Sequence, residues 1–299
     1  MSMDLSRSSA AVRLGFVLFW TALLPVSEAH AFCRLTTEMP IDGGCTKKGI
    51  PLWWMRECIS FSVRDRDYDQ PSLRAIRDAA SRSFASWTEA RCNNEAPVGV
   101  KVAQTALLGE CDSPEYNRNS GNANTVIFIV DWADRELPSD AFGLTLVWHD
   151  TDTGQIFDAD MQINETLGEV DVCIGDCPPG AVDLQNVMTH EAGHFLGLGH
   201  SPEPTATMSA RATIGETIKR DLHLDDRAGI CTVYGEGEPN CAKADYMPDN
   251  GFSQICSPPE VRQACGVSAP RGDGRLGWPG AVALAALGLA ALRPVRRRR

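Results

Sequence analysis

Basic side chains are scarce in this sequence. Lysine and arginine together number 28 against 39 aspartates and glutamates among 299 residues, so the formal net charge is −11. Proteins that bind nucleic acid need clustered lysine and arginine to neutralise phosphates. We therefore expect an acidic, solvated surface and no nucleic-acid partner.

Two signatures of hydrolytic enzymes are missing as well. No Gly-x-Ser-x-Gly segment, the turn that presents a nucleophilic serine, is present. The tripeptide Asp-Thr-Gly of aspartic proteases occurs once, at residues 152–154, whereas those enzymes need two carboxylates that share a proton. The sequence therefore supports neither class, and we interpret residues 152–154 as a turn.

Long apolar runs are few. Residues 14–26 form one run, behind a basic start and ahead of Ala29-His30-Ala31, which is a small-x-small cleavage site. This pattern predicts a signal peptide over residues 1–31, with Phe32 as the first residue of the exported chain; a retained anchor is the alternative. A second run, residues 276–292, has 17 residues, which is the lower limit for a helical membrane span.

Cysteine is well represented, with 11 residues. Outside the cell most cysteines form disulfides, and an odd number leaves at least one over. We predict that the ten cysteines before Cys265 all pair and that Cys265 has another fate. Cys173 and Cys177 are expected to close a small disulfide loop; a metal-binding pair is the alternative, but no second pair has matching spacing.

Histidine is scarce, at six residues, yet three of the six lie close together. On a helix His190 and His194 are one turn apart on the same face, where two imidazoles can bind one metal ion. Gly197 lets the chain leave the helix, so that His200 returns as a third ligand. Three protein ligands leave the fourth position of a zinc ion open, which is typical of a catalytic site. Glu191 lies beside the first ligand and is the candidate general base.

This extended histidine segment resembles the zinc-binding motif of metzincin metalloproteases, and its surroundings resemble the matrixin family within that clan. Ser201 follows the third histidine directly, as in matrixins. Met208 comes where matrixins carry the methionine of the Met-turn beneath the metal. Residues 224–235 resemble the last helix of the family. The resemblance covers roughly residues 55–235 and is strongest from residue 182 onward.

The resemblance implies an α+β metzincin catalytic domain over residues 51–235. Its expected architecture is a twisted, mixed, five-stranded sheet with a long active-site helix and a C-terminal helix. It also implies one catalytic Zn²⁺, a peptide or protein substrate, a monomer, and Met208 as a hydrophobic floor under the metal. The segment 209–224 should line the primary specificity pocket. Ser209-Ala210 departs from the family, which has proline at the second position. The resemblance therefore does not predict the shape of the wall of that pocket.

The hydrophobic periodicity agrees with this layout. Apolar residues that alternate or run continuously predict five strands, near residues 59–63, 98–102, 126–130, 144–148 and 156–163. Asp69 is expected to cap a helix over residues 71–90. Apolar residues at helical spacing over residues 181–188 place the histidine motif on a second helix.

Two further metal sites can be considered. Matrixins often bind a structural zinc through three histidines, but only His149 and His223 remain outside the catalytic motif and the signal peptide. We therefore do not expect that second zinc. Calcium stays open, because oxygen-rich loops suit it and four carboxylates gather around the turn; the alternative is an exposed acidic turn. These carboxylates are Asp150, Asp152, Asp158 and Asp160.

The remaining segments flank the catalytic domain. Residues 32–50 form a lead-in too short for a folded prodomain, although Cys33 or Cys45 in it offers a way to block zinc. Residues 236–275 contain Cys, Pro and Gly and are predicted to form a stalk or a disulfide-stapled appendage.

Residues 276–299 combine the second apolar run with a terminal arginine cluster, which the positive-inside rule keeps on the cytoplasmic side. Together with the stalk this tail resembles the MYXO-CTERM sorting tails of bacterial surface proteins, in which a cysteine before the span marks processing. Cys265 fills that position. A plain C-terminal membrane anchor is the alternative.

The predicted function is thus an exported, cell-surface or secreted zinc endopeptidase with Glu191 as the general base. The alternative from another class is a surface binding or adhesion protein that keeps a structural zinc site with little turnover. The intact Glu191 argues against that alternative, because a purely structural site needs no base.

Overall fold

The structure is a computed structural model that describes residues 32–38, 45–66, 71–254 and 280–289. The predicted signal peptide and Cys265 lie outside these ranges. The strands are β1 Cys33–Arg34, β2 Trp53–Trp54, β3 Cys58–Val63, β4 Lys101–Gln104, β5 Thr125–Ile129, β6 Ala141–His149, β7 Gln155–Asn164, β8 Glu169–Asp171, β9 Ala181–Asp183, β10 Leu198–Gly199, β11 Arg211–Ala212 and β12 Gly280–Leu289. The α-helices are α1 Leu73–Thr88, α2 Leu184–Phe195 and α3 Leu224–Tyr234, with short 3₁₀ turns at Asn93–Glu95, Ile218–Arg220 and Lys243–Tyr246.

The central sheet is mixed, as expected, but it has more strands than expected. Its order is β11-β12-β6-β7-β5-β3-β4, with β2 added beside β7, which makes eight strands. The five predicted strands form the contiguous part from β6 to β4, in which only β6 runs antiparallel to its neighbour β7. The additional strands are short or distant in sequence and carry weak period-2 signals, so sequence periodicity did not reveal them.

Three predicted boundaries are wrong. Residues 181–183, assigned to the second helix, form strand β9, and α2 begins at Leu184 after its N-cap Asp183. The first helix begins at Leu73, because the Ser72 hydroxyl caps it by accepting from the Ala75 amide at 3.3 Å; Asp69 lies outside the described residues. β4 begins at Lys101, three residues after the predicted start. The amide of the preceding Gly99 donates to the Gly235 carbonyl at 3.0 Å instead of joining the sheet.

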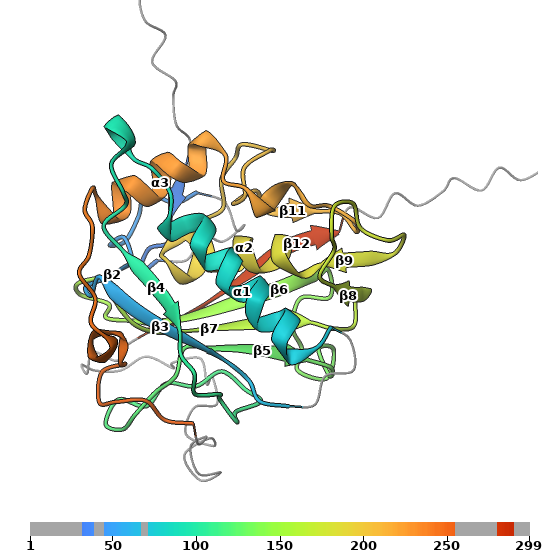
Figure 1. The fold of residues 1–299 in the computed structure, drawn as a ribbon, viewed down its shortest axis with the longest axis horizontal. Coiled ribbons are helices and arrows are strands. Elements are labelled where there is room, and N and C mark those ends of the chain that lie inside the picture. Colours follow the sequence, from blue (N-terminus) through green and yellow to red (C-terminus); the bar gives the residue numbers. More distant parts are fainter. Residues whose placement is uncertain (1–31, 39–44, 67–70, 255–279, 290–299) are drawn as a thin grey trace, which may run out of the picture.

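Helices α1 and α2 cover one face of the sheet (Figure 1), and the main core lies between them and the strands. The rings of Phe61 in β3, Phe84 in α1 and Phe195 in α2 pack at centroid distances of 4.4 and 4.9 Å. Aromatic pairs of this kind contribute about 0.5–1.5 kcal/mol each beyond their burial. The indole of Trp87 donates to the Thr189 carbonyl at 2.7 Å and so ties α1 to α2. The motif helix is thereby held rigidly against the sheet.

Disulfides connect the periphery to this core. Cys58–Cys241 and Cys92–Cys231 join segments 183 and 139 residues apart, and Cys33–Cys45 and Cys173–Cys177 close short loops. Cys111 is also disulfide-bonded. The predicted Cys173–Cys177 loop is confirmed. All nine described cysteines are paired, while the pairing of the tenth and the fate of Cys265 stay predictions.

Residues 280–289, within the second apolar run, are in an extended conformation. Gly280–Leu289 is a strand that runs antiparallel to β6 and parallel to β11. The edge of β6 opposite β7 would present unpaired backbone groups without this strand, and β12 satisfies them. Among the described residues, no helix is long and apolar enough to cross a membrane.

Candidate metal site

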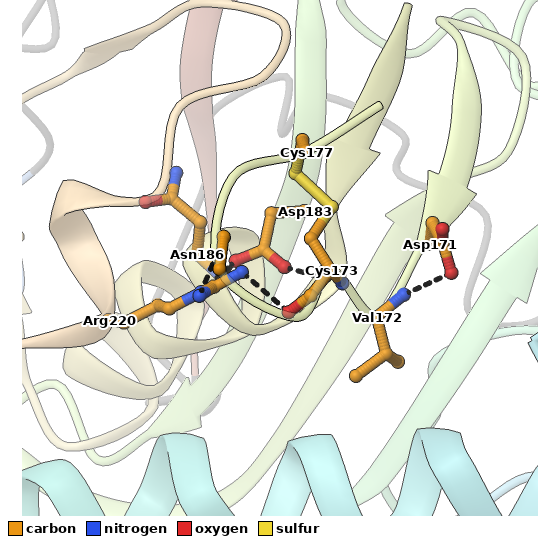
Figure 2. The surroundings of a disulfide bond; sticks show 8 residues. Asp171, Val172, Cys173, Cys177, Asp183, Asn186 and Arg220 are labelled. Carbon is orange, nitrogen blue, oxygen red and sulfur yellow. Dashed lines mark hydrogen bonds and ion pairs between the residues drawn. A yellow bond between two sulfur atoms is a disulfide. The ribbon is translucent and has the colours of Figure 1, made fainter. Parts of the chain in front are cut away.

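The start of α2 is held by a network of charges. Asp183 is the N-cap and accepts from the Asn186 amide at 2.9 Å. The other carboxylate oxygen accepts from the Cys173 amide at 3.2 Å, and the Arg220 guanidinium pairs with Asp183 at 2.6 Å and donates to the Cys173 carbonyl at 2.9 Å. Figure 2 shows how this network joins the disulfide loop of Cys173 and Cys177 to the helix. The helix that carries the histidines therefore begins at a defined residue.

The three predicted ligands meet in space. His190 and His194 lie one turn apart on α2 and are fully buried, and His200 follows β10. One ring nitrogen from each lies within 4.8 Å of the others, and the Nε2 atoms of His194 and His200 are 3.2 Å apart. Gly197 has a φ of +87°, and an added Cβ there would meet the Leu52 carbonyl oxygen at 2.6 Å. Only glycine permits this turn, as the sequence predicted.

Backbone carbonyls orient two of the rings. Nδ1 of His190 donates to the Thr207 carbonyl at 2.6 Å, and Nδ1 of His194 to the Leu198 carbonyl at 2.8 Å. These bonds leave Nε2 as the ligand atom of each ring, and Nε2 of His190 has no hydrogen-bond partner among the described residues. Burial, together with the neighbouring imidazoles, lowers the pKa of both histidines well below the usual value. Neutral imidazoles with convergent lone pairs fit Zn²⁺.

Glu191 is fully buried beside this cluster. Oε2 accepts a hydrogen bond of 2.7 Å from the Thr145 hydroxyl on β6, while Oε1 has no partner within the described part of the chain. Burial raises the pKa of Glu191 to about 8, and the bond from Thr145 opposes that shift. An added Cβ at Gly143 would lie 2.8 Å from Oε1. Sequence reasoning missed Thr145 and Gly143. Both lie 46 or more positions before Glu191 in the sequence, and no motif indicates that they contact it.

Met208 packs against Gly193 of α2. It is 2 % exposed, and an added Cβ at Gly193 would collide with its sulfur. The carboxylate of Asp226 in α3 accepts from the amides of Thr207 and Met208 at 2.7 and 3.0 Å. Helix α3 thus fixes the turn that lies beneath the histidines.

The four acidic residues around the turn separate into two pairs. Asp150 and Asp152 lie at the turn, where Asp150 accepts from the amides of Asp152 and Thr153. Asp158 and Asp160 are buried on β7. Among the described residues the four do not form one metal-binding group; the second such group, besides the histidines, is Cys173, Cys177 and Asp183. Its sulfurs are bonded to each other and its carboxylate pairs with Arg220, so it is structural.

Two histidines on one helix and a third after a glycine turn, with a methionine below them, fit a zinc site. Residues 126–235 of the chain match the family model described as Matrixin. Similar proteins include Metalloendoproteinase 1-MMP of Arabidopsis thaliana, 53% identical over 57 residues, which are 18% of this chain and 15% of that protein. Metalloendoproteinase 4-MMP of Arabidopsis thaliana is 45% identical over 83 residues, 27% of this chain and 23% of the relative.

The matches to animal proteins are similarly short. Matrix metalloproteinase-16 of Homo sapiens is 47% identical over 53 residues, which cover 18% of this chain and 9% of the relative. Each of these matches spans less than a quarter of the relative's own length. The similarity to these relatives therefore concerns only a part of each of them.

Proposed function

We propose that this protein is an exported zinc-dependent endopeptidase with Glu191 as its general base. The observation that carries the proposal is the pairing of two features in one buried place. Three imidazoles converge with the donor set that zinc prefers. Beside them stands a carboxylate with one oxygen engaged by Thr145 and the other without a partner among the described residues.

Each residue has a defined task in peptide hydrolysis. His190, His194 and His200 would hold the metal, and a bound zinc ion supplies Lewis-acid chemistry by acidifying water and polarising a carbonyl oxygen. Oε1 of Glu191 takes the proton of the attacking water and passes it to the nitrogen of the leaving amine. The Thr145 hydroxyl holds Oε2, so the carboxylate keeps one orientation during both transfers.

Incubation of the purified protein with a peptide library tests the function directly. We expect cleavage that a metal chelator abolishes and added Zn²⁺ restores. Cleavage that persists in full after removal of the metal would contradict the proposal. A protein that retains zinc and cleaves no peptide would favour the alternative, a surface binding protein with a structural zinc site.

We propose calcium binding only for the buried pair on β7, Asp158 and Asp160. Both oxygens of Asp160 accept backbone amides, from Thr125 at 2.7 Å and Glu115 at 2.9 Å. Asp158 is fully buried, and neither of its oxygens has a hydrogen-bond partner among the described residues. A buried carboxylate without partners is costly unless it is neutral or binds a cation. Calcium should raise the melting temperature of the wild type and not that of Asp158→Asn; equal responses of the two proteins would reject the site.

Export and surface attachment are also proposals, supported by the signal-like residues 1–31 and the sorting-like tail of residues 276–299. We expect the tail to be removed, so that the mature protein ends near Cys265. The intact mass of protein from its native envelope measures this. A chain that still carries Arg296–Arg299 leaves only the plain anchor.

A further inference from the structure

Lys219 is a buried cation in the segment that was expected only to line the specificity pocket. It lies in the 3₁₀ turn Ile218–Arg220, and its side chain is 1 % exposed. An ammonium group in such a place is costly unless its three N–H donors are all satisfied. Burial lowers the pKa of Lys219 to about 8, while the carboxylates of Glu216 and Asp226 act in the opposite direction.

All three donors of this ammonium group go to the turn around Met208. Nζ donates to the carbonyls of Ser209 at 2.8 Å, Thr207 at 3.3 Å and Ala206 at 3.4 Å. The amides of the same turn donate to Asp226. The peptide groups beneath the histidines are therefore held between a cation on their carbonyl side and a carboxylate on their amide side.

One of these carbonyls is also the partner of a metal ligand. The Thr207 carbonyl accepts from Nδ1 of His190 at 2.6 Å and from Nζ of Lys219. Partners of this kind fix the tautomer and the orientation of a ligating imidazole. We propose that Lys219 is a positioning residue for the metal site, which holds the Thr207 carbonyl where it directs Nε2 of His190 at the ion. The inference rests on the proposed zinc function of the three histidines.

The role of the ammonium group can be tested by a substitution that leaves the backbone contacts of residue 219 in place. The amide of Lys219 donates to the side-chain oxygen of Asn186 at 2.8 Å, which ties the turn to α2 independently of the side chain. Lys219→Met keeps this tie and similar volume but leaves three buried carbonyls without their donor. Such carbonyls tend to reorient toward other donors or water, because an unsatisfied buried acceptor is unfavourable. The Thr207 carbonyl is expected to move with them.

The experiment compares zinc affinity in the full chain, by competition with a chelator. We expect Lys219→Met to bind Zn²⁺ roughly 10–100-fold more weakly than the wild type, which is the usual effect of losing an outer-shell partner. The visible spectrum of the Co²⁺-substituted protein should change as well, since it reports ligand geometry. Lys219→Arg retains the charge and several donors and should recover most of the affinity.

Arg135→Met is the matched control. It removes a partly buried cation, whose partners include Asp131 and the Asp112 carbonyl, and it breaks no bond to the Met208 turn or to α2. Its zinc affinity and Co²⁺ spectrum should stay those of the wild type even where folding stability falls. Equal losses in both variants would overturn the inference, and so would wild-type affinity with an unchanged spectrum in Lys219→Met.

Two outcomes keep the inference separate from the proposed function. If Lys219→Met does not fold, Lys219→Gln, which lacks the charge and has two donors, takes its place under the same criterion. A wild type that binds no zinc contradicts the metal site itself. A wild type that binds zinc no better than the Lys219 variants contradicts only the role of Lys219.

Discussion

Replacing Glu191 with glutamine is expected to remove most peptide hydrolysis while leaving zinc in place. The amide has nearly the same shape and can still accept the hydrogen bond from Thr145, but it cannot take a proton from water. Loss of a general base lowers the rate roughly 10²–10⁴-fold. Measurement of kcat/KM together with the zinc content of the purified variant separates a lost base from a lost metal.

Glu169→Gln provides the control for this substitution. Glu169 is an exposed carboxylate on β8, so its loss changes the net charge by the same amount without contact with the histidines. Its activity should match that of the wild type. The proposed role of Glu191 is wrong if Glu191→Gln keeps more than about a tenth of the wild-type rate, since general-base loss costs far more than that.

Removal of any one of His190, His194 and His200 should release the metal. Each alanine variant deletes one of three protein ligands, and two imidazoles cannot complete the tetrahedral site that zinc favours. Elemental analysis after dialysis is expected to find one zinc per chain in the wild type and little in each variant. Peptide hydrolysis should fall in parallel with the metal.

His149→Ala is the matched control for the ligand variants. His149 is equally buried, on β6, but it lies outside the histidine cluster, and its Nδ1 contacts the Val147 carbonyl. This variant should retain zinc, whatever the effect on folding stability. Full zinc occupancy after substitution of any one of the three ligands would remove that residue from the site.

Much of this protein is encoded locally. His190 and His194 are predictable because a helix places residues four apart on one face, and Gly197 because a left-handed turn requires glycine. The five central strands follow from runs of apolar residues, and the small disulfide loop follows from the spacing of its cysteines. In each case the residues that decide the feature are within a few positions of one another, so the sequence shows them together.

Other features depend on which elements pack together. Thr145 and Gly143 reach Glu191 only because β6 lies beside α2, and Lys219 meets the Thr207 carbonyl only because its turn folds under the motif. The acidic residues that the sequence grouped at one turn are separated by the pleat and burial of β7. Residues 280–289, whose composition suits a membrane helix, form a strand that pairs with β6.

The difference between the locally encoded features and those that depend on packing has one physical cause. Periodicity and turn chemistry are properties of neighbouring residues, and they predict the candidate metal ligands and the elements that carry them. The partners of those ligands depend on side-chain and carbonyl positions from segments distant along the chain. Packing brings these segments together, and the spacing of residues in the sequence does not predict these contacts.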